Sequence, residues 1–492
     1  MKNQNDPRLN QVKVLLSRGL HNLALELAED LKQADPRLGQ EALLHVYAEM
    51  RDHLSFLNES DGIDAMELPA NLREFFINSH IFVGNTKDLR ELVDELLSRQ
   101  STANDTLAII STLDEIGDTN AALELLDKAP VEVRKTIKGQ YLEGKIALSQ
   151  KDYQSSVTKL EDVKSVISKK PRSPRSIAMK KSIAFHLARA YDKLNDFKAA
   201  WRAAEEGYEE EDLPFDIDLY EEFCNQLMKF FTKKRLRSLN RSSEFPVEPL
   251  LVMGNPRSGT TLLDTILGMH NQVASGGELS IGIKIQNEIP KLLDSYSGFP
   301  DCLVDLRIPD ANKLALDYAN CVSRISMGRK YVTNKALNIS MQLGLFYCIT
   351  PSMKVISLHR HPLDNCISCY LSLVSVPGHN YNKRQEHQAK VWMIRRRLQD
   401  HWAEVAEETP ILQLHYESMV HNQEYETKRI LNFFDLEFQG DCLNFHESSS
   451  IAATVSKKQV QEPMYTTSAG RWKNYEPYIP KLVEQLGPWC PD

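Results

Sequence analysis

The stretch PLLVMGNPRSGTTLLDTIL, which begins at residue 249, carries residues that suit the binding of a phosphate or a similar anion. Gly254 and Gly259 have the spacing of the nucleotide-binding P-loop, G-x-x-x-x-G-K-S/T, and Thr261 stands at the hydroxyl position of that motif. Thr260 replaces the lysine, and Arg257 adds a positive charge inside the loop. Because a P-loop lysine reaches the β- and γ-phosphates and the hydroxyl after it binds magnesium, this loop disfavours ATP hydrolysis and kinase chemistry.

The segments on either side of this loop predict how the anion is held. The apolar run PLLVM predicts a buried strand before the loop, and TTLLDTIL predicts a helix after it. The first N–H groups of a helix have no partner inside the helix, and the helix dipole favours an anion beside them. The planar guanidinium of Arg257 suits a pair of phosphate or sulfate oxygens. We therefore predict an anion site at the start of this helix.

A second anion motif lies in MKVISLHRHPLDNCISCY. Arg360 stands at the end of a predicted strand, and Ser368 follows eight residues later within the next predicted helix. Pro362 suits the first turn of that helix. Alone, such a pair is more typical of a surface salt bridge and a serine on a helix face. Beside the loop described above, it predicts a second site for a negative group.

The residues after position 234 alternate between short apolar runs and helical patterns. PLLVMG, KYVTN, MKVISLH and PILQLHY predict buried strands, and patterns such as RQEHQAKVWMIRRRLQDHWAEVAEE predict the helices between them. Alternation of this kind predicts a parallel sheet with helices on both faces. Ligands of such sheets bind beyond the carboxyl ends of the strands, where both anion motifs fall. We predict a P-loop-like α/β domain over residues 235–492.

The residues up to position 234 predict helix after helix, with Gly and Pro at the turns. IISTLDEIGDTNAALELLDKAP and YLEGKIALSQKDYQSSVTKLEDV share one plan, in which Ala122 and Ser156 lie 34 residues apart. HLARAYDKLNDFKAAWRAAEEG repeats the plan with Ala200, and a weaker copy near the N-terminus contains Ala24. This period resembles tetratricopeptide repeats. We predict an all-α domain of such repeats over residues 1–234, suited to bind a peptide or protein, while a structural or dimerising role stays open.

The two anion motifs, in this order, resemble those of sulfotransferases that use 3′-phosphoadenosine 5′-phosphosulfate (PAPS). PRSGTT resembles the loop that holds the 5′-phosphosulfate, and RHPLDNCIS resembles the element that holds the 3′-phosphate. Helical repeats followed by such a domain are similar to bacterial tetratricopeptide-repeat sulfotransferases, and the catalytic domain resembles the protein-tyrosine sulfotransferases of animals. The resemblance implies transfer of a sulfuryl group from PAPS to an acceptor hydroxyl, without a metal ion.

The resemblance also implies which side chains hold the donor. The loop residues wrap the 5′-phosphosulfate, the Arg and Ser of the second motif hold the 3′-phosphate, and a tyrosine after PILQLH lies by the adenine or ribose. A further basic residue for the 3′-phosphate comes from the segment TTSAGRWKNYEPY. The donor-binding residues implied in this way are Arg257, Ser258, Gly259, Thr260, Thr261, Arg360, Ser368, Tyr416 and Arg471.

The same resemblance implies which side chains act during transfer. Glu278 resembles the general base, which is needed because the acceptor hydroxyl must lose its proton as it attacks sulfur. Lys335 matches the lysine at the bridging oxygen, where charge builds as the S–O bond breaks. Ser456 aligns with a serine near the same oxygen, and Arg257 places a positive charge on the reacting group. Asn334 is a weaker candidate beside Lys335.

Composition excludes several other classes of protein. The chain has 492 residues, of which 42% are apolar and 26% charged, and its formal charge of -8 argues against a general binder of nucleic acid or anionic membranes. The first residues lack the apolar core of a secretory signal, and no apolar run is long enough to span a bilayer, so we predict a cytoplasmic protein with reduced thiols. Cys366 and Cys369 form a lone C-x-x-C in a helical pattern, so we predict no metal site.

Two other functions stay open at the level of sequence. A P-loop kinase would turn over ATP with magnesium, and a non-enzymatic scaffold would use the repeats beside an inactive nucleotide-binding domain. The acceptor is open as well, since a protein tyrosine or a peptide recruited by the repeats is one class and a saccharide, lipid or small molecule is another. An oligomer is compatible with all of these functions.

Overall fold

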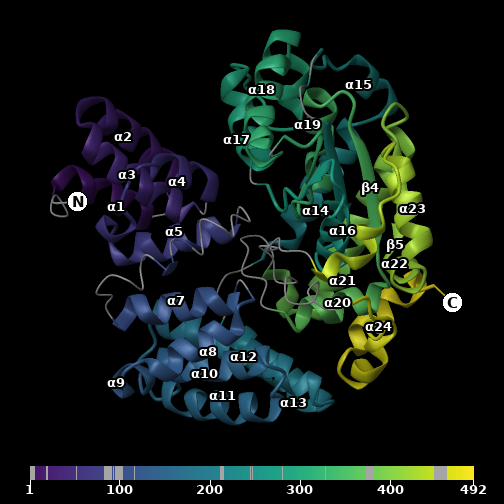
Figure 1. Ribbon diagram of the computed structural model, residues 1–492. Coiled ribbons are helices and arrows are strands. Elements are labelled where there is room, and N and C mark those ends of the chain that lie inside the picture. The colour runs from purple at the N-terminus through teal and green to yellow at the C-terminus, as the bar shows by residue number, and fades with distance from the viewer. Residues whose placement is uncertain are drawn as a thin grey trace. The chain divides into compact units, whose positions relative to one another are not determined.

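The structure, a computed structural model drawn in Figure 1, describes most of the chain. The protein divides into two compact units, one of residues up to 152 and one that begins at Tyr153. The described residues are 6–17, 20–50, 52–82, 91, 93–94, 103–115, 117–210, 215–243, 245, 248–279, 281–326, 328–372, 380–447 and 463–491.

The first unit is helical throughout its described residues. Its turns follow from local chemistry: Gly117 takes a left-handed φ of 92° before α8, and Asp118 caps that helix by accepting a hydrogen bond from the N–H of Ala121. Ala122 is fully buried. The elements are α1 (Pro7–Ser17), α2 (His21–Ala34), α3 (Pro36–Glu49), α4 (His53–Glu59), η1 (Ala65–Glu67), α5 (Ala70–Phe82), α7 (Ala103–Glu115), α8 (Thr119–Lys128), α9 (Val131–Arg134) and α10 (Ile137–Ser149).

The second unit begins with helices that precede the predicted α/β domain. Ser173 and Ser176 form a capping box at the start of α12, where Pro174 occupies the first turn. Asp196 caps α13 in the same way that Asp118 caps α8, and Ala200 on that helix is fully buried. These elements are α11 (Tyr153–Ile167), α12 (Pro174–Lys193), α13 (Phe197–Glu209), α14 (Ile217–Phe230) and α15 (Lys233–Ser238).

A five-stranded parallel sheet follows, in the order β2-β3-β1-β4-β5. In register, Leu250 of the central strand lies opposite Thr333 on one side and Lys354 on the other. The four predicted strands and their parallel arrangement are confirmed. The sequence did not predict β2, because two residues are too few to show an apolar pattern. The strands are β1 (Glu248–Gly254), β2 (Val273–Ala274), β3 (Tyr331–Asn334), β4 (Lys354–His359) and β5 (Ile411–His415).

Helices cover both faces of this sheet, as alternating strands and helices predicted. The helices predicted directly after β1 and β4 are α16 and α20, and the long predicted helix is α21. The elements are α16 (Thr260–Gly268), α17 (Ile281–Leu292), η2 (Asp301–Asp305), α18 (Ile308–Ser326), α19 (Ile339–Ile349), α20 (Pro362–Tyr370), η3 (Asn380–Lys383), α21 (Gln385–Val405), α22 (Tyr416–His421), α23 (Gln423–Phe433), η4 (Gly440–Glu447), η6 (Arg471–Tyr478), α24 (Pro480–Leu486) and η7 (Gly487–Trp489).

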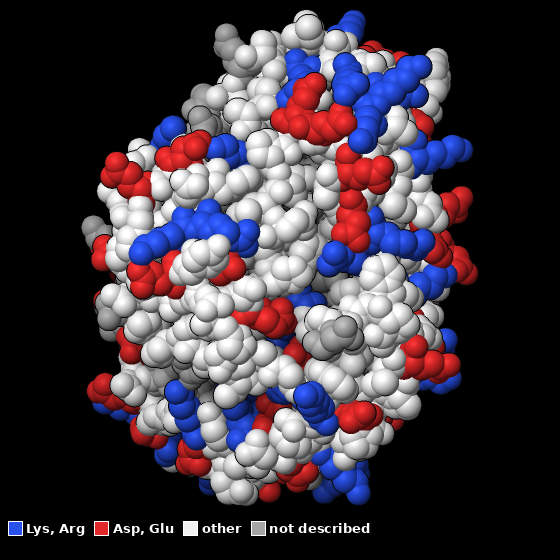
Figure 2. All heavy atoms as spheres, turned by 90° about the vertical axis from the view of Figure 1, so that its right-hand side faces the viewer, with Lys and Arg blue, Asp and Glu red and all other residues white. Residues whose placement is uncertain are grey.

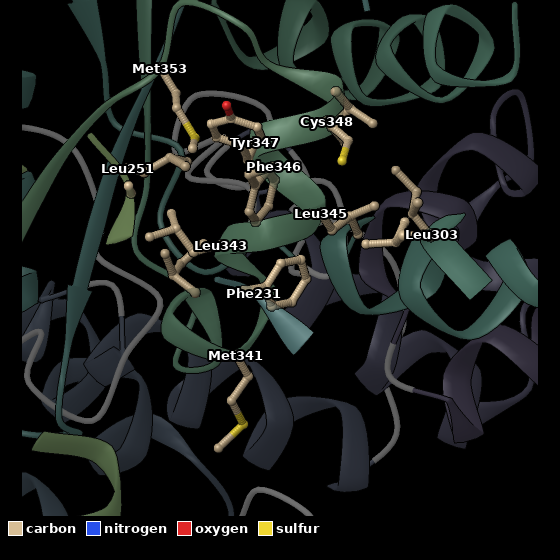
Figure 3. Close-up of a cluster of buried hydrophobic side chains, with 14 of the residues drawn as sticks. Phe231, Leu251, Leu303, Met341, Leu343, Leu345, Phe346, Tyr347, Cys348 and Met353 are labelled. Atoms are coloured by element: carbon tan, nitrogen blue, oxygen red, sulfur yellow. The ribbon is translucent and has the colours of Figure 1, made fainter. Parts of the chain in front are cut away.

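The central strand β1 divides its side chains between two apolar clusters. Leu250 and Val252 pack with side chains of α16, α22 and α23, whereas Leu251 and Met253 pack with side chains of α14, α18, α19 and α21. Figure 3 shows the second cluster, in which α19 lies beside β1. Because successive strand residues point to opposite faces, an all-apolar strand requires a helical layer on each side.

Helix α14 belongs to this core although it precedes the predicted boundary between residues 234 and 235, and α15 crosses that boundary. Phe231, directly after α14, packs on Trp402 of α21 with ring centroids 5.0 Å apart. A Cβ on Gly344 would lie 2.1 Å from Cζ of Phe231, so α19 approaches this ring only through a glycine. The all-helical region is thus followed by an α/β domain, while the exact boundary and the tetratricopeptide assignment stay predictions.

Charge is mixed over the visible surface. Figure 2 shows Lys and Arg interspersed with Asp and Glu over one face, rather than a broad field of one sign. Within the described residues, no helix combines the length and the apolar character needed to cross a membrane.

Candidate active site

The loop between β1 and α16 has the backbone geometry of an anion cradle. Gly259, the N-cap residue of α16, has a φ of 102° and offers no side chain to cap the helix. Arg257 also has a positive φ, 65°, a conformation that costs a non-glycine residue about 1–3 kcal/mol and recurs at functional sites. The positive end of α16 therefore faces the loop without a competing side-chain acceptor at its N-cap.

Two close approaches explain the glycines of this loop. A Cβ on Gly259 would lie 2.6 Å from Cδ2 of Tyr416, and a Cβ on Gly254 would lie 2.6 Å from Oγ of Ser258. Tyr416, at the start of α22, therefore packs directly on the backbone of the loop. The folded loop therefore requires glycine at both of these P-loop positions for steric reasons.

The two predicted anion motifs meet in space. Nε of Arg257 donates a hydrogen bond to Oγ of Ser368 at 3.1 Å, and Nη1 of Arg360 donates to the backbone carbonyl of Arg257 at 2.9 Å. The guanidinium of Arg360 also lies over the ring of Tyr416, 4.6 Å from its centroid. These contacts therefore join the end of β4 to the loop that follows β1. Strands β1 and β4 are neighbours in the sheet.

A cleft opens beside these contacts, with about 580 Å³ of empty space that includes open solvent. It brings together seven of the predicted donor-binding residues, and it adds six residues that the sequence did not indicate. The predicted residues that line it are Arg257, Gly259, Thr261, Arg360, Ser368, Tyr416 and Arg471, and the others are Leu262, Phe445, Pro463, Met464, Tyr465 and Ser468.

The cleft is electrostatically prepared for an anion. Burial, together with a smaller effect of the neighbouring positive charge of Arg360, lowers the pKa of Arg257 to about 10. Nε of Arg360 and Oγ of Ser258 are buried without a hydrogen-bond partner among the described residues. Because a buried polar atom without a partner is costly, these atoms suit a ligand with several acceptor oxygens.

Glu278 and Lys335 form an ion pair at the carboxyl end of β3. Nζ of Lys335 lies 3.0 Å from Oε1 of Glu278, and the lysine side chain is fully buried while the carboxylate is 28% exposed. The backbone N–H of Lys335 donates to the carbonyl of Gly277, so the segment before the carboxylate is held to the strand end. Neither side chain lines the cleft, but β3 is the direct neighbour of β1.

The part of the chain that contains the site matches a known protein family. Residues 249–440 match the profile of the Sulfotransferase family. These residues form a sulfotransferase domain. PAPS is the donor that this family implies, and the match covers β1 to β5 with the helices between them.

Two relatives match over different lengths of the chain. An "uncharacterized protein" of Aquifex aeolicus (strain VF5) is 24% identical over 463 residues, which cover 89% of this chain and 58% of that protein. A "putative protein-tyrosine sulfotransferase" of Caenorhabditis briggsae is 25% identical over 236 residues, 45% of this chain and 80% of that protein. The chain therefore spans less than two thirds of the length of the Aquifex relative.

Solved sulfotransferase domains are more distant. The domain from the curacin biosynthetic pathway is 16% identical with a TM-score of 0.35, over 50% of this chain and 99% of that one. The domain from the Synechococcus PCC 7002 olefin synthase is 20% identical with a TM-score of 0.36, over 48% of this chain and 91% of that one.

Three carboxylates, two of them buried and one largely buried, support the site of the sulfotransferase domain without having been predicted. Asp264, in the apolar helix α16, accepts hydrogen bonds from Ser275 and Thr333, which ties the segment before Glu278 to β3. Asp364 accepts from the backbone N–H groups of two residues around Arg471, and Asp192 pairs with the Arg471 side chain. The one signal in the sequence that could have indicated such a carboxylate is an acidic residue inside an apolar helix pattern, as in TTLLDTIL.

The remaining predicted residues are placed as follows. Ser258 and Thr260 are buried in the loop and first turn but do not line the cleft, and Ser456 lies outside the described residues. Asn334 donates to the hydroxyl of Tyr318 and accepts from the N–H of Ala336, so its side chain holds the strand end. These contacts give Asn334, the weaker candidate, a structural role at the end of β3.

The cysteines of the C-x-x-C pattern belong to the core. Cys366 and Cys369 are free and buried, and burial raises the pKa of both thiols, that of Cys369 to about 11. Among the described residues, no group of three or more His, Cys, Asp and Glu side chains is arranged to hold a metal ion.

Proposed function

We propose that this chain binds PAPS in the cleft beside the β1–α16 loop and transfers its sulfuryl group to an acceptor hydroxyl. One observation carries the proposal: Arg257, Ser368 and Arg360 join two separate anion motifs at one cleft. ATP has a single chain of phosphates, whereas PAPS has negative groups at its 5′ and 3′ positions. A cleft with two adjoining anion sites therefore suits PAPS better than ATP.

The roles of the donor-binding residues follow from their places in the cleft. Arg257, Gly259 and Thr261, which line the cleft, surround the 5′-phosphosulfate together with their loop neighbours Ser258 and Thr260. The guanidinium of Arg257 and the start of α16 supply positive charge. Arg360, Ser368 and Arg471 hold the 3′-phosphate. Tyr416, which packs on Gly259 and lines the cleft, presents its ring to the base or ribose. Two arginines and backbone dipoles balance a sulfuryl group, which carries less charge than a terminal phosphoryl group, so the proposed transfer needs no metal.

Transfer takes place in one in-line step. The acceptor oxygen forms a bond to sulfur, and the S–O bond to the 5′-phosphate breaks with its electron pair passing to the bridging oxygen. Glu278 takes the acceptor proton, and the ammonium of Lys335 balances the charge that develops on the bridging oxygen. Their contact at 3.0 Å supports this division of roles, because it places base and cation side by side at one strand end. Ser456 is proposed to assist at the same oxygen.

A protein tyrosine is the acceptor we propose. The Caenorhabditis briggsae relative carries protein-tyrosine sulfotransferase in its description, and helical arrays present surfaces that bind peptides. We propose that the helical region consists of tetratricopeptide-like repeats and recruits such a protein. A cytoplasmic location stays a prediction, supported by eight free cysteines.

Binding of adenosine 3′,5′-bisphosphate to the full chain, measured by calorimetry, tests the donor site. Arg257→Ala and Arg360→Ala each remove charge-assisted hydrogen bonds, so each should weaken binding about 10- to 100-fold. Arg307→Ala is the control, since that arginine is 75% exposed and pairs with Asp310 on its own helix turn. Wild-type affinity in both cleft variants would refute the site.

Turnover separates the proposed activity from its alternatives. The full chain is incubated with radiosulfate-labelled PAPS and a cell lysate, and the labelled product is treated with protease. Label that becomes acid-soluble and is recovered as sulfotyrosine supports a protein acceptor, and label in protease-resistant material points to a saccharide, lipid or small molecule. Magnesium-dependent ATP turnover with no sulfate transfer would support a kinase instead.

A further inference from the structure

Arg471, a residue of the cleft wall, is held through its backbone. The N–H groups of Gly470 and Trp472, the residues on either side of it, donate to the two carboxylate oxygens of Asp364 at 2.6 and 2.7 Å. Asp364 lies in the first turn of α20, the helix that follows Arg360. The peptide that carries Arg471 is therefore anchored to the second anion motif.

Its side chain is held by a different part of the chain. Nη2 of Arg471 pairs with Oδ1 of Asp192, and the hydroxyl of Tyr475 donates to the same oxygen at 2.6 Å. Asp192 lies near the end of α12, in the helical region before the sulfotransferase domain. The side chains are largely buried, with 24% of Arg471 and 11% of Asp192 exposed, so the pair is shielded from screening by solvent.

Aromatic packing holds the two helices of this region against the same segment. Tyr475 is fully buried and its ring lies 5.3 Å from that of Phe197. Trp201 of α13 stacks on Tyr370 of α20 with centroids 4.1 Å apart and on Tyr478 at 5.8 Å. Helices α12 and α13 are thus packed on both η6 and α20, and the contact between Asp192 and Arg471 is part of a larger buried surface.

We propose that Asp192 is a positioning residue, which directs the guanidinium of Arg471 toward the 3′-phosphate so that the helical region completes the donor site. A guanidinium has five N–H donors in a rigid plane, so one arm can be held by Asp192 while other arms serve the cleft that Arg471 lines. A long side chain held at both ends loses less freedom on binding an anion, which strengthens binding. The inference rests on the proposed function, because it needs a 3′-phosphate in this cleft.

The test compares two nucleotides on the full chain. Calorimetry measures the affinity of wild type and Asp192→Asn for adenosine 3′,5′-bisphosphate and for adenosine 5′-phosphate. We expect Asp192→Asn to bind the bisphosphate about tenfold more weakly and the monophosphate with unchanged affinity. Asp192→Glu keeps the charge and should recover part of the loss.

The controls separate positioning from stability. Glu206→Gln breaks an ion pair of 2.5 Å between Glu206 of α13 and Lys164 of α11, and should leave both affinities unchanged. Should Asp192→Asn fail to fold, Tyr475→Phe removes the second hydrogen bond to the carboxylate while keeping the ring. It should weaken bisphosphate binding about two- to fivefold, again without effect on the monophosphate.

Each remaining outcome is decisive. A wild-type chain that binds no bisphosphate refutes the proposed function itself. A wild-type chain that binds it, with equal or tighter binding in Asp192→Asn, overturns the positioning role alone. Equal weakening for both nucleotides would mean that Asp192 acts only on the stability of the fold, and this too would overturn the inference.

Discussion

Glu278 combines access to solvent with a fixed neighbour. Its carboxylate is 28% exposed and lies 3.0 Å from the fully buried ammonium of Lys335. The segment before it is secured by the hydrogen bond between Lys335 and Gly277 and by the hydrogen bond from Gly276 to Thr333. A base in such a position can meet an acceptor from outside while its orientation is set from inside.

Glu278→Gln should therefore lower turnover without weakening donor binding. The amide keeps the shape and a contact with Lys335 but takes no proton, so we expect kcat to fall about 10²- to 10⁴-fold. The affinity for adenosine 3′,5′-bisphosphate, measured on the same preparation, should stay the same. Glu288→Gln, at an exposed position of α17, serves as the control. Turnover that survives in Glu278→Gln would remove Glu278 from the role of base.

Site residues that belong to a local sequence motif could be predicted from the sequence. Site residues whose partners lie far away in the sequence could not. Arg257, Arg360 and Ser368 follow predicted strands at recognisable spacing, and the structure brings them together. Asp192 has its partner 279 residues later in the chain, at Arg471, so no local pattern marks it. Electrostatic support of this kind depends on tertiary contacts, which a single sequence does not reveal.

At the scale of elements, the junction of β1, its loop and α16 depends on close approach. Gly259 has a φ of 102° and faces the ring of Tyr416, which belongs to α22. The loop can therefore lie between two helices only if this position has no side chain. Gly328, in the turn before β3, also has a positive φ, 80°, but a Cβ there would meet no atom within 4 Å.

Gly259→Ala should cost more than Gly328→Ala for this reason. Both substitutions place a Cβ in a left-handed conformation, which costs roughly 1 kcal/mol. Only Gly259→Ala adds a clash with Tyr416, so we expect a further loss of stability and at least tenfold weaker binding of the bisphosphate. Urea unfolding and calorimetry measure the two effects. Equal losses in both variants would mean that the close approach to Tyr416 has no consequence.

Elements with a strong pattern could be predicted, and weak ones could not. The buried strands β1, β3, β4 and β5 are continuous apolar runs bounded by loops, and their alternation with helices is enough to predict a parallel sheet. The two residues of β2 offer no period, and their pairing follows only from the position of β3. The residues of α14 predict only an amphipathic helix like those before it. Its place in the α/β core therefore could not be predicted from its own residues.

At the scale of the whole molecule, the donor site and its support belong to one compact unit. Every described residue that lines the cleft lies after Tyr153, and so do Asp192 and the aromatic side chains around Tyr475. Phe231, which precedes the family match, fills the core between α19 and α21. The smallest part of the chain expected to bind the donor is therefore larger than residues 249–440.

Two truncated chains test this expectation. Residues 153–492 keep all described cleft residues and should bind adenosine 3′,5′-bisphosphate within about twofold of the full chain. Residues 235–492 lose Asp192, Trp201 and Phe231, and removal of a buried aromatic side chain alone costs about 3–5 kcal/mol. This shorter chain should therefore unfold at lower urea concentration and bind the nucleotide weakly, as circular dichroism and calorimetry would reveal. Tight binding by residues 235–492 would mean that the sulfotransferase domain is complete without the helices, and weak binding by a folded 153–492 chain would mean that the first unit contributes to the donor site.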